Sequence, residues 1–505
     1  MKKHVGCLIM LSLLCICFFP ESGKAASNTL YVGSVKADNT KVYSSPALGS
    51  TIRKTLKKGE RFPVISTIAG DSAKPIVHTV IAGNTLWKVA NQYGVSIGDI
   101  QKENKLGSSD IIVGQKLKIP QKYKIHTVVS GDTLWKISNK YEVAVSDLTK
   151  LNNLRKTSLN VGQKLKLPDY YYQVQLLDGK KGWIKKSLFP KKAQKRIVMG
   201  WKHNGSQENY TQQLKQPNLN VVSPRSYTLT DSGHFVSASV DTKYVQTAHK
   251  QGKKVWQLIG NKFDPALTGS VLGNEKKRQK LVTALRDSLV KTNSDGINVD
   301  FENIDPKNKK DFVLFISELK KALKPHGITI SVDVTRENED PFWSKSLDRK
   351  ELGKIADYII IMGYDEHWGG SPVAGSVSSL PWIKEGTRLL MKDVPAHKII
   401  LAVPFYTREW VTDLSTGEVT SHDRNMAEVN RIVSAHKLKK VWDKNTSQNY
   451  VEYTSKGEKH QIWMEDKKSM TLRLDLVRQN QLGGVAAWYI GAETADIWDV
   501  YHFNQ

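Results

Sequence analysis

Hydrophobic residues in the C-terminal three-fifths of the chain form short runs separated by amphipathic stretches. From about Arg196 these runs read RIVMGW, LNVVSPRSY, KKVWQLIG, GINVDFE, ITISVDV, DYIIIMGYD, KIILAVPFY and GGVAAWYIG. Stretches such as KKRQKLVTALRDSLVKT lie between many of them, with apolar residues three and four positions apart, which is typical of helices. Eight strands alternating with helices predict a closed parallel (β/α)8 TIM barrel. An open doubly wound sheet is the alternative, although no glycine-rich phosphate-binding motif follows the first strand.

The N-terminal part of the chain contains a repeat. VHTVIAGNTLWKVANQYGV begins at Val77 and IHTVVSGDTLWKISNKYEV begins at Ile125, and the similarity extends over 77–120 and 125–168. Each copy predicts a strand, a glycine turn, two short helices and a final strand, which is a small α/β module. Thr85 and its counterpart Thr133 suit the N-cap of the first helix.

The inward face of that first helix is predicted from its apolar residues. We expect Trp87 and Trp135 to face the core of their modules, together with Val89 and Ile137.

Strand patterns flank the repeat on both sides. Residues 29–67 alternate apolar and polar positions between turn sequences but stop before a small barrel could close, and residues 169–189 supply two further strands around the Asp178-Gly179 turn. We therefore expect one split β-barrel with the repeats inserted in a surface loop. Two unrelated β fragments are the alternative.

The first residues indicate export. Lys2 and Lys3 precede an apolar run from Val5 to Pro20, and small residues follow, which predicts a signal peptide over 1–26. The run is shorter than the ~20 residues of a membrane span, and no later segment is apolar enough, so we expect no transmembrane segment after cleavage. All three cysteines fall within 1–26, so the exported chain would carry no disulfide.

The formal net charge of +26 predicts attraction to an acidic partner. Export argues against nucleic acid and favours an anionic cell wall, to which dispersed Lys and Arg residues would bind weakly and in a salt-sensitive way. A generally solvated surface explains the same charge.

The stretch DGINVDFE carries the candidate chemistry. Asn298, Asp300 and Glu302 occupy alternate positions, so they share one face of the predicted fourth strand. In a TIM barrel this order places Glu302 at the carboxyl-terminal rim, Asp300 below it and Asn298 deeper. Asp295 lies on the other face, where we expect it to brace the strand entry. A solvent-facing strand or a cation site would show a similar pattern.

Both repeats resemble LysM modules over their full length. The resemblance implies binding of N-acetylglucosamine-containing glycans in a shallow groove between the turn before the first helix and the loop before the last strand. The matching residues are Gly83, Asn84, Thr85 and Ile111 in the first copy and Gly131, Asp132, Thr133 and Leu159 in the second. The same residues could serve only as turns and core.

The flanking strands, with the Gly182-Trp183 pair in the last hairpin, resemble a bacterial Src-homology-three-like domain of the wall-targeting kind. Four motifs between 196 and 505 resemble glycoside hydrolase family 18, which includes the chitinases: DGINVDFE on the fourth strand, MGYD on the sixth, VPFYTR on the seventh and GGVAAW on the eighth. Short strand signals at about 410–465 resemble the small insertion that some members carry after the seventh strand.

The family resemblance implies retaining hydrolysis in which the acetamido oxygen of the substrate acts as the nucleophile. Glu302 would be the general acid and base, Asp300 would orient the acetamido group, and Tyr364 would bind its carbonyl. The resemblance assigns substrate contacts to Asp365, Trp488, Tyr406 and Arg408. Trp488 could instead be barrel core and Asp365 a strand-end cap. Non-catalytic members characteristically lose the acid, which is present here as Glu302.

Two positions depart from the family pattern. Asn298 stands where the signature has an aspartate, and we expect its amide to donate a hydrogen bond to Asp300. The third strand reads WQLIGN instead of SxGG. Together with the LysM modules, these departures resemble the branch that acts on bacterial peptidoglycan, including spore-cortex-lytic glucosaminidases.

The sequence thus predicts a secreted, wall-associated endo-β-N-acetylglucosaminidase acting on peptidoglycan, in a vegetative wall or a spore. A chitinase and a non-catalytic glycan-binding protein are the alternatives. No cofactor is implied, and the histidines show no metal-ligand spacing such as HExxH.

Overall fold

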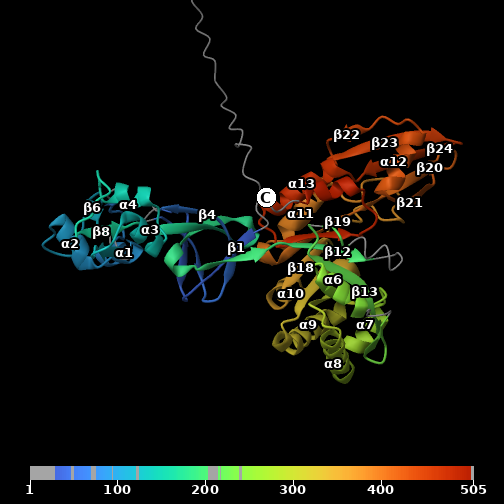
Figure 1. Ribbon diagram of the computed structural model, residues 1–505, viewed down its shortest axis with the longest axis horizontal. Coiled ribbons are helices and arrows are strands. Elements are labelled where there is room, and N and C mark those ends of the chain that lie inside the picture. The colour runs from blue at the N-terminus through green and yellow to red at the C-terminus, as the bar shows by residue number, and fades with distance from the viewer. Residues whose placement is uncertain are drawn as a thin grey trace, which may run out of the picture.

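A computed structural model describes residues 29–46, 50–69, 76–93, 95–120, 124–202, 214–216, 218–237 and 242–501. The predicted signal peptide, 1–26, lies outside these residues. The two repeats lie at one end of the molecule, a β-sheet follows them, and the large C-terminal domain forms the other end (Figure 1).

The C-terminal domain is a closed parallel barrel, which confirms the predicted fold class. Its strands, in order around the barrel, are β12 (Ile197–Lys202), β13 (Val221–Thr230), β15 (Lys254–Gly260), β16 (Gly296–Asp300), β17 (Thr329–Thr335), β18 (Tyr358–Met362), β19 (Ile399–Pro404) and β25 (Gly484–Trp488). The barrel closes because β12 pairs in parallel with both β13 and β25. One strand was not predicted: β14 (His234–Ser237) pairs antiparallel with β13.

Helices cover the outside of the barrel. They include α6 (Thr242–Lys250), α7 (Pro265–Leu272), α8 (Glu275–Lys291), α9 (Lys309–Leu323), α10 (Arg349–Ile355), α11 (Leu380–Leu390) and α13 (Lys467–Gln479). The apolar face of α9 is buried, and its Phe312 and Phe315 stack on Phe301 with ring centroids 5.9 and 5.8 Å apart. Phe301 belongs to the outward-facing set of DGINVDFE, so this packing fixes which side of the strand faces the barrel interior.

A five-stranded antiparallel sheet extends from the carboxyl-terminal end of β19. It contains β20 (Tyr406–Asp413), β21 (Val419–Asn425), β22 (Val441–Asp443), β23 (Gln448–Ser455) and β24 (Glu458–Met464), with α12 (Met426–Ala435) packed against it.

A buried ion pair lies where this sheet returns to the barrel. Arg473 Nη2 donates to Glu465 Oε1 at 2.7 Å, and both side chains are almost fully buried. Arg473 also donates to the Ser378 carbonyl, and the Ser378 hydroxyl donates to the Gly363 carbonyl at 2.6 Å. The ion pair therefore connects the inserted sheet to the residue that precedes Tyr364.

Strands from both sides of the repeats form one seven-stranded sheet. Its order is β11 (Lys191–Lys195), β1 (Thr29–Ser34), β4 (Arg61–Ala69), β9 (Tyr170–Gln175), β10 (Lys181–Lys185), β2 (Thr40–Tyr43) and β3 (Ile52–Leu56). Strand β11, which was not predicted from the sequence, leads directly into the first barrel strand.

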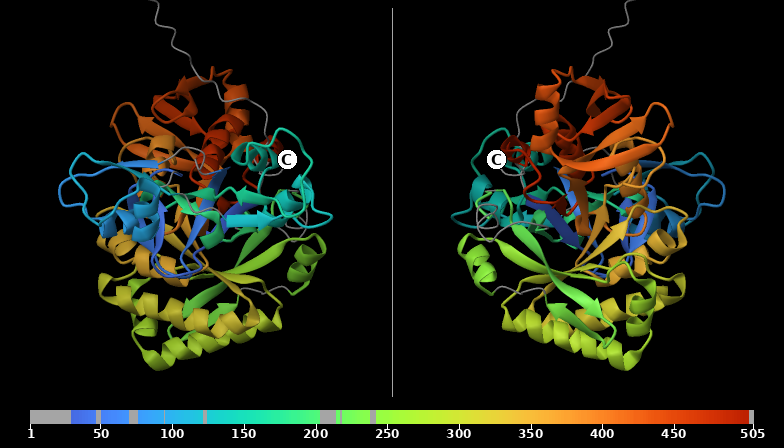
Figure 2. Two further views of the ribbon diagram at one scale, coloured as in Figure 1. Left: turned by 90° about the vertical axis from the view of Figure 1, so that its left-hand side faces the viewer. Right: turned by 90° about the vertical axis from the view of Figure 1, so that its right-hand side faces the viewer.

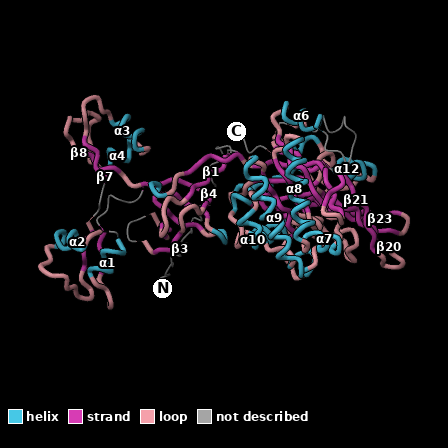
Figure 3. Tube along the Cα trace, turned by 90° about the horizontal axis from the view of Figure 1, so that it is seen from below, coloured by secondary structure: helices cyan, strands magenta, loops and turns pink. Residues whose placement is uncertain are grey.

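Figure 3 shows this sheet between the repeats and the barrel domain, and its hydrogen bonds reach the amino-terminal end of the barrel. Gln175 Nε2 donates to the Asn480 carbonyl at 2.8 Å, and the Asp178 amide donates to the Met391 carbonyl at 2.7 Å. Asn480 precedes β25 and Met391 precedes β19, so both contacts lie at the ends where the barrel strands begin.

Each repeat folds as a two-stranded sheet with two helices. The first contains β5 (Ile76–Thr79), α1 (Leu86–Tyr93), α2 (Ile97–Asn104) and β6 (Lys116–Ile119), and the second contains β7 (Lys124–Thr127), α3 (Leu134–Tyr141), α4 (Val145–Leu151) and β8 (Lys164–Leu167). The repeats lie beside the seven-stranded sheet, at the end of the molecule turned toward the viewer in the left panel of Figure 2.

The predicted burial of the two tryptophans is wrong. Trp87 and Trp135 are 63% and 68% exposed, whereas Val89 and Ile137 are fully buried. Leu86, Val89 and Ala90 define the inward face of α1 at helical spacing, and Trp87 lies about 100° around the helix from Leu86. The tryptophans are therefore surface side chains.

Candidate functional site

The fourth strand places its polar residues as the alternation predicts. Asn298 is fully buried. Asp300 and Glu302, which follow it toward the carboxyl-terminal end of the strand, are half-buried. Strand β16 ends at Asp300, so Glu302 lies just beyond it, at the start of the loop. Asp295 does brace the strand entry, because its carboxylate accepts from the Val255 amide and pairs with His249 Nε2, both at 2.8 Å.

The hydrogen bonds of Asn298 differ from the expectation. Its Oδ1 accepts from Trp201 Nε1 at 2.8 Å, which orients the amide. Its Nδ2 then donates to Asp333 Oδ1 at 2.8 Å and to Ser331 Oγ at 3.1 Å, both on the neighbouring strand β17. The predicted bond to Asp300 is therefore replaced by a bond across the sheet, because the indole fixes the direction of the amide.

The sequence analysis did not single out Asp333. Its side chain is 2% exposed in the barrel interior. The signal was present, because Ser331 and Asp333 alternate with apolar residues in TISVDVT as the polar residues of the fourth strand do. The parallel register of β16 and β17 brings these two polar faces together.

Burial and like charge raise the pKa values of these carboxyl groups. Burial raises the pKa of Asp300 to about 6, although nearby Arg225 and a hydrogen bond with Glu302 act in the opposite direction. Burial, followed by repulsion from Asp300, Asp333 and Asp365, holds the pKa of Glu302 well above its ordinary value. A protonated Glu302 that donates to an ionised Asp300 is the arrangement these shifts favour.

Aromatic rings form the apolar part of the site. Trp488 packs on Trp201 with centroids 5.6 Å apart and stacks on Tyr364 at 6.3 Å. Tyr364 follows the end of β18, and Trp488 is the last residue of β25. Burial, followed by the charges of Asp333, Asp300 and Glu302, raises the pKa of Tyr364 well above its ordinary value, so its hydroxyl stays protonated and can donate. The structure thus brings Tyr364 next to the acidic residues.

Asp365, Tyr406 and Arg408 form a separate cluster at the rim. Tyr406 Oη donates to Asp365 Oδ1 at 2.6 Å, and Arg408 Nη2 donates to the same oxygen at 3.1 Å. Arg408 also pairs with Asp423 of the inserted sheet. Tyr406 is 6% exposed and the Arg408 side chain 12%, so these residues hold Asp365 in place and present little surface of their own.

The departure on the third strand has a structural role that was not predicted. Asn261 follows β15 and is 1% exposed. Its Nδ2 donates to the Glu302 carbonyl at 2.7 Å, and its Oδ1 accepts from the Glu302 amide at 3.1 Å. Asn261 therefore fixes the backbone of the candidate acid from both sides.

The residues carried over from the LysM resemblance lie around the first turn of each module. Gly83 and Gly131 have φ of +81° and +83°, which a side chain would disfavour. Thr85 and Thr133 cap their helices as predicted, accepting from the backbone amides of Lys88 and Lys136 at 3.2 and 3.1 Å. Asn84 and Asp132 hydrogen-bond to a histidine in the preceding strand, at 2.8 Å in each module. The last two residues, Ile111 and Leu159, pack against the module cores.

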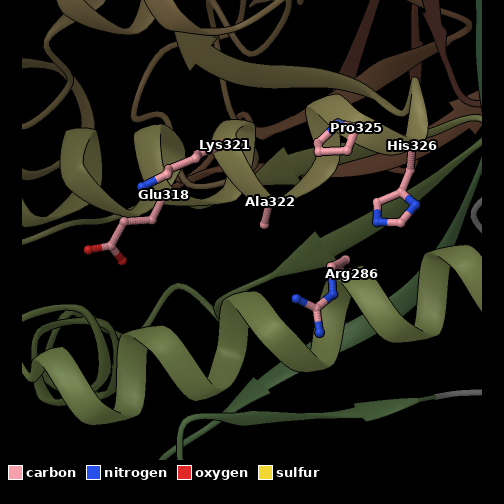
Figure 4. A pocket seen from close by; sticks show the side chains of 6 residues that line it. All are labelled: Arg286, Glu318, Lys321, Ala322, Pro325 and His326. Carbon is pink, nitrogen blue, oxygen red and sulfur yellow. The ribbon is translucent and has the colours of Figure 1, made fainter.

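The described residues were also compared with the requirements of a metal site, a second pocket and a membrane span. No group of His, Cys, Asp and Glu side chains among them is arranged to hold a metal ion. A depression of about 600 Å³ between α8 and α9 is lined by side chains such as Arg286, Glu318 and His326, and it lies on the outside of the barrel (Figure 4). No helix in the described part of the chain has the length and apolar character needed to cross a membrane.

Comparison with known proteins identifies two families. The family described as glycosyl hydrolases family 18 matches residues 196–493, more than half of the chain. The LysM domain matches residues 78–120 and 126–168.

Two curated relatives are similar to the C-terminal part of the chain. The "Uncharacterized glycosylase YvbX" of Bacillus subtilis is 28% identical over 292 residues, which cover 55% of this chain and 83% of that protein. The "Cortical fragment-lytic enzyme" of Bacillus anthracis is 26% identical over 269 residues, which cover 51% of this chain and 62% of that protein.

Solved structures extend the similarity of fold. The Bacillus cereus spore cortex-lytic enzyme SleL has a TM-score of 0.58 and 23% identity, covering 85% of this chain and 98% of that one. A chitinase from Chromobacterium violaceum has a TM-score of 0.56 and 21% identity, covering 61% of this chain and 98% of that one.

Proposed function

The chain belongs to glycosyl hydrolases family 18 and is a glycoside hydrolase, and on that premise we propose that it is an exported, wall-associated endo-β-N-acetylglucosaminidase acting on peptidoglycan. The observation that carries the proposal is the acid Glu302 at the barrel mouth, beside Asp300 and with its backbone fixed by Asn261. The LysM modules favour a polymer that contains N-acetylglucosamine. The name of the cortical fragment-lytic relatives favours peptidoglycan.

Bond cleavage would proceed in two steps with retention of configuration. In the first step the acetamido oxygen of the substrate attacks the anomeric carbon, the glycosidic bond breaks, and Glu302 gives its proton to the leaving oxygen. In the second step Glu302 accepts a proton from water, whose oxygen attacks the anomeric carbon and opens the oxazolinium ring. The acid is regenerated for the next cycle.

Asp300 would orient the acetamido N–H and stabilise the positive charge that forms on the ring. Within the described residues its buried Oδ1 has no hydrogen-bond partner, which leaves an acceptor for that N–H. Tyr364 would donate to the acetamido carbonyl, and Trp488 would supply an apolar surface under the sugar. Asp365, held by Tyr406 and Arg408, would bind a hydroxyl of the same sugar.

The part of the chain before the barrel would hold the enzyme on its polymer. The seven-stranded sheet, which we assign to a Src-homology-three-like domain, and the exposed first turns of both LysM modules would contact the wall. The net charge of +26 would add attraction to wall polyanions. An export signal over 1–26 would deliver the chain to this compartment.

Incubation of the purified protein with peptidoglycan and, separately, with chitin oligomers tests the proposal, with the new reducing ends read by mass spectrometry. Release of fragments ending in N-acetylglucosamine from peptidoglycan alone is expected. Equal release from both polymers would favour a general chitinase activity. Release from neither polymer, with binding retained, would leave a glycan-binding protein.

A further inference from the structure

Asp333 is a buried acidic residue that the two-step reaction does not use. It lies on β17 with 2% of its surface exposed, and no Lys, Arg or His in the described part of the chain forms an ion pair with it. Burying a carboxyl group without a positive partner is costly, and an asparagine of the same shape would avoid the cost. Retention of the acid therefore points to a role in the site.

The position of Asp333 follows from Asn298. Because Trp201 occupies the Asn298 carbonyl oxygen, the Asn298 amide must donate across the sheet, and Asp333 Oδ1 receives that bond at 2.8 Å. Asp333 therefore lies on the polar face of β17, next to the face of β16 that carries Asp300, and it is close enough for its charge to act on Glu302.

On these contacts, and building on the proposed function, we propose that Asp333 is a positioning residue: the third acidic group of a cluster with Asp300 and Glu302, which keeps Glu302 protonated for proton donation. Three carboxyl groups this close together, one buried and two half-buried, repel one another when all are ionised, so each group favours the protonated form of its neighbours. Within the cluster, Asp300 also feels the positive charge of Arg225, on β13.

The charged and titratable groups around the cluster come from every strand end that packs there. They are Arg225 on β13, Asp300 on β16, Asp333 on β17, Tyr364 and Asp365 after β18, and Tyr406 and Arg408 on β20. Burial and repulsion from Asp300 hold the pKa of Asp333 well above its ordinary value, which agrees with a shared proton. At position 298, where the family signature has an aspartate, the neutral Asn298 donates a hydrogen bond to Asp333 and adds no fourth carboxyl group to the cluster.

Exchange of the two side chains tests the proposal. Asp333→Asn removes the third acid, and the double variant Asn298→Asp with Asp333→Asn returns a carboxyl group to the other side of the same hydrogen bond. The pH dependence of kcat and KM on peptidoglycan fragments is measured for both, with Asp305→Asn as the control. Asp305 is an acid near the rim whose side chain caps a helical turn and pairs with Lys307.

In Asp333→Asn the alkaline limb of kcat is expected to move down by roughly one pH unit, with KM little changed. The double variant should recover most of that shift, and Asp305→Asn should match the wild type. An unchanged alkaline limb in Asp333→Asn would overturn the proposal.

A second measurement does not depend on turnover. The carboxyl carbons of Asp300 and Glu302 are followed by NMR titration in protein carrying ¹³C-labelled Asp and Glu, and the Glu302 midpoint is expected to fall in Asp333→Asn. An unshifted midpoint would contradict the role of Asp333 even if the wild type cleaves glycan. Loss of the proposed function would appear separately, as a wild type that releases no fragments while the carboxyl titrations remain linked.

Discussion

Asn261 and Glu302 form a reciprocal pair of hydrogen bonds, in which the Asn261 side-chain amide donates to the Glu302 carbonyl at 2.7 Å and accepts from the Glu302 amide at 3.1 Å. Because Asn261 also donates to Thr268 Oγ1 at 2.8 Å, its own orientation is fixed. The loop after the fourth strand is thus held to the loop after the third, and the acid is held at a defined height above the barrel.

Replacing Asn261 by alanine should therefore impair catalysis more than binding. The Glu302 backbone would lose both partners, and a displacement of about 1 Å at a reacting group costs roughly a hundredfold in rate. We expect kcat to fall by about that factor with KM little changed. Asn303→Ala is the matched control, since that side chain donates to the Phe263 carbonyl at the same rim and does not hold Glu302. Equal kcat values for the two variants would refute the role of Asn261.

Glu302→Gln should abolish fragment release, by a factor of roughly 10²–10⁴, and leave binding to wall polymer intact. It should also stabilise the fold at alkaline pH. The folded state raises the pKa of Glu302, so it binds a proton that the unfolded chain, with a pKa of about 4.3, has released. The contribution of the acid to stability is full below that pH and declines as pH rises.

Urea unfolding at pH 5 and pH 8 measures this effect. The free energy of unfolding of Glu302→Gln should exceed that of the wild type by more at pH 8 than at pH 5. A constant difference would show that Glu302 is not protonated preferentially in the folded state.

The decline of activity on the acid side of the pH profile should follow the protonation of the Asp300 carboxylate. Its pKa of about 6 means that the carboxylate needed to stabilise the positive ring is lost as pH falls through this value, so kcat/KM should decline below about pH 6. Asn298→Asp should change the profile, because the amide donor to Asp333 is replaced by a carboxylate that faces an acceptor. Identical profiles for the wild type and Asn298→Asp would refute this account.

Arg473→Met should destabilise the barrel domain by about 3–5 kcal/mol, because it leaves Glu465 buried without its positive partner. The double change Glu465→Gln with Arg473→Met should cost less, since no charge is then left unpaired. Chemical unfolding of both variants checks the order, and the exposed pair of Lys345 and Glu339 provides a control whose removal should have no measurable effect. A larger loss in the double variant would contradict the explanation.

The LysM tryptophans should contribute nothing to module stability. Trp87→Ser should leave the first module folded, whereas Leu86→Ala, which removes a side chain that is 1% exposed, should cost about 2–5 kcal/mol. Amide hydrogen exchange in β5 and β6 distinguishes them. Faster exchange in Trp87→Ser would mean that the indole supports the fold despite its exposure.

Periodicity along the chain was sufficient to predict the barrel strands, because a strand buried on both sides reads as an apolar run and many of these runs are followed by a helical pattern. Alternation was also sufficient to order Asn298, Asp300 and Glu302 by depth. The same rule could have identified Asp333, whose alternating polar pattern is just as clear. What could not be read from one strand was the arrangement of its neighbours. Trp201 orients the Asn298 amide, and the register of β16 and β17 places the polar face of β17 beside it, so the amide meets Asp333 instead of Asp300.

The error at Trp87 and Trp135 has a different cause. Apolar character alone predicted an inward position for Trp87, whereas the helical rotation of about 100° per residue turns it away from the core once Leu86 and Val89 point inward. The pair of hydrogen bonds from Asn261 to the Glu302 backbone could not be predicted either, because a contact with backbone atoms does not depend on which residue supplies them.

The seven-stranded sheet contacts the barrel at the end where the barrel strands begin, while Glu302 lies at the end where they finish. The two LysM repeats and the candidate acid Glu302 are therefore held at opposite ends of the protein. An enzyme built in this way would bind one glycan strand through its LysM repeats and cleave a different strand, so that the strand to which it is bound stays intact after each cleavage.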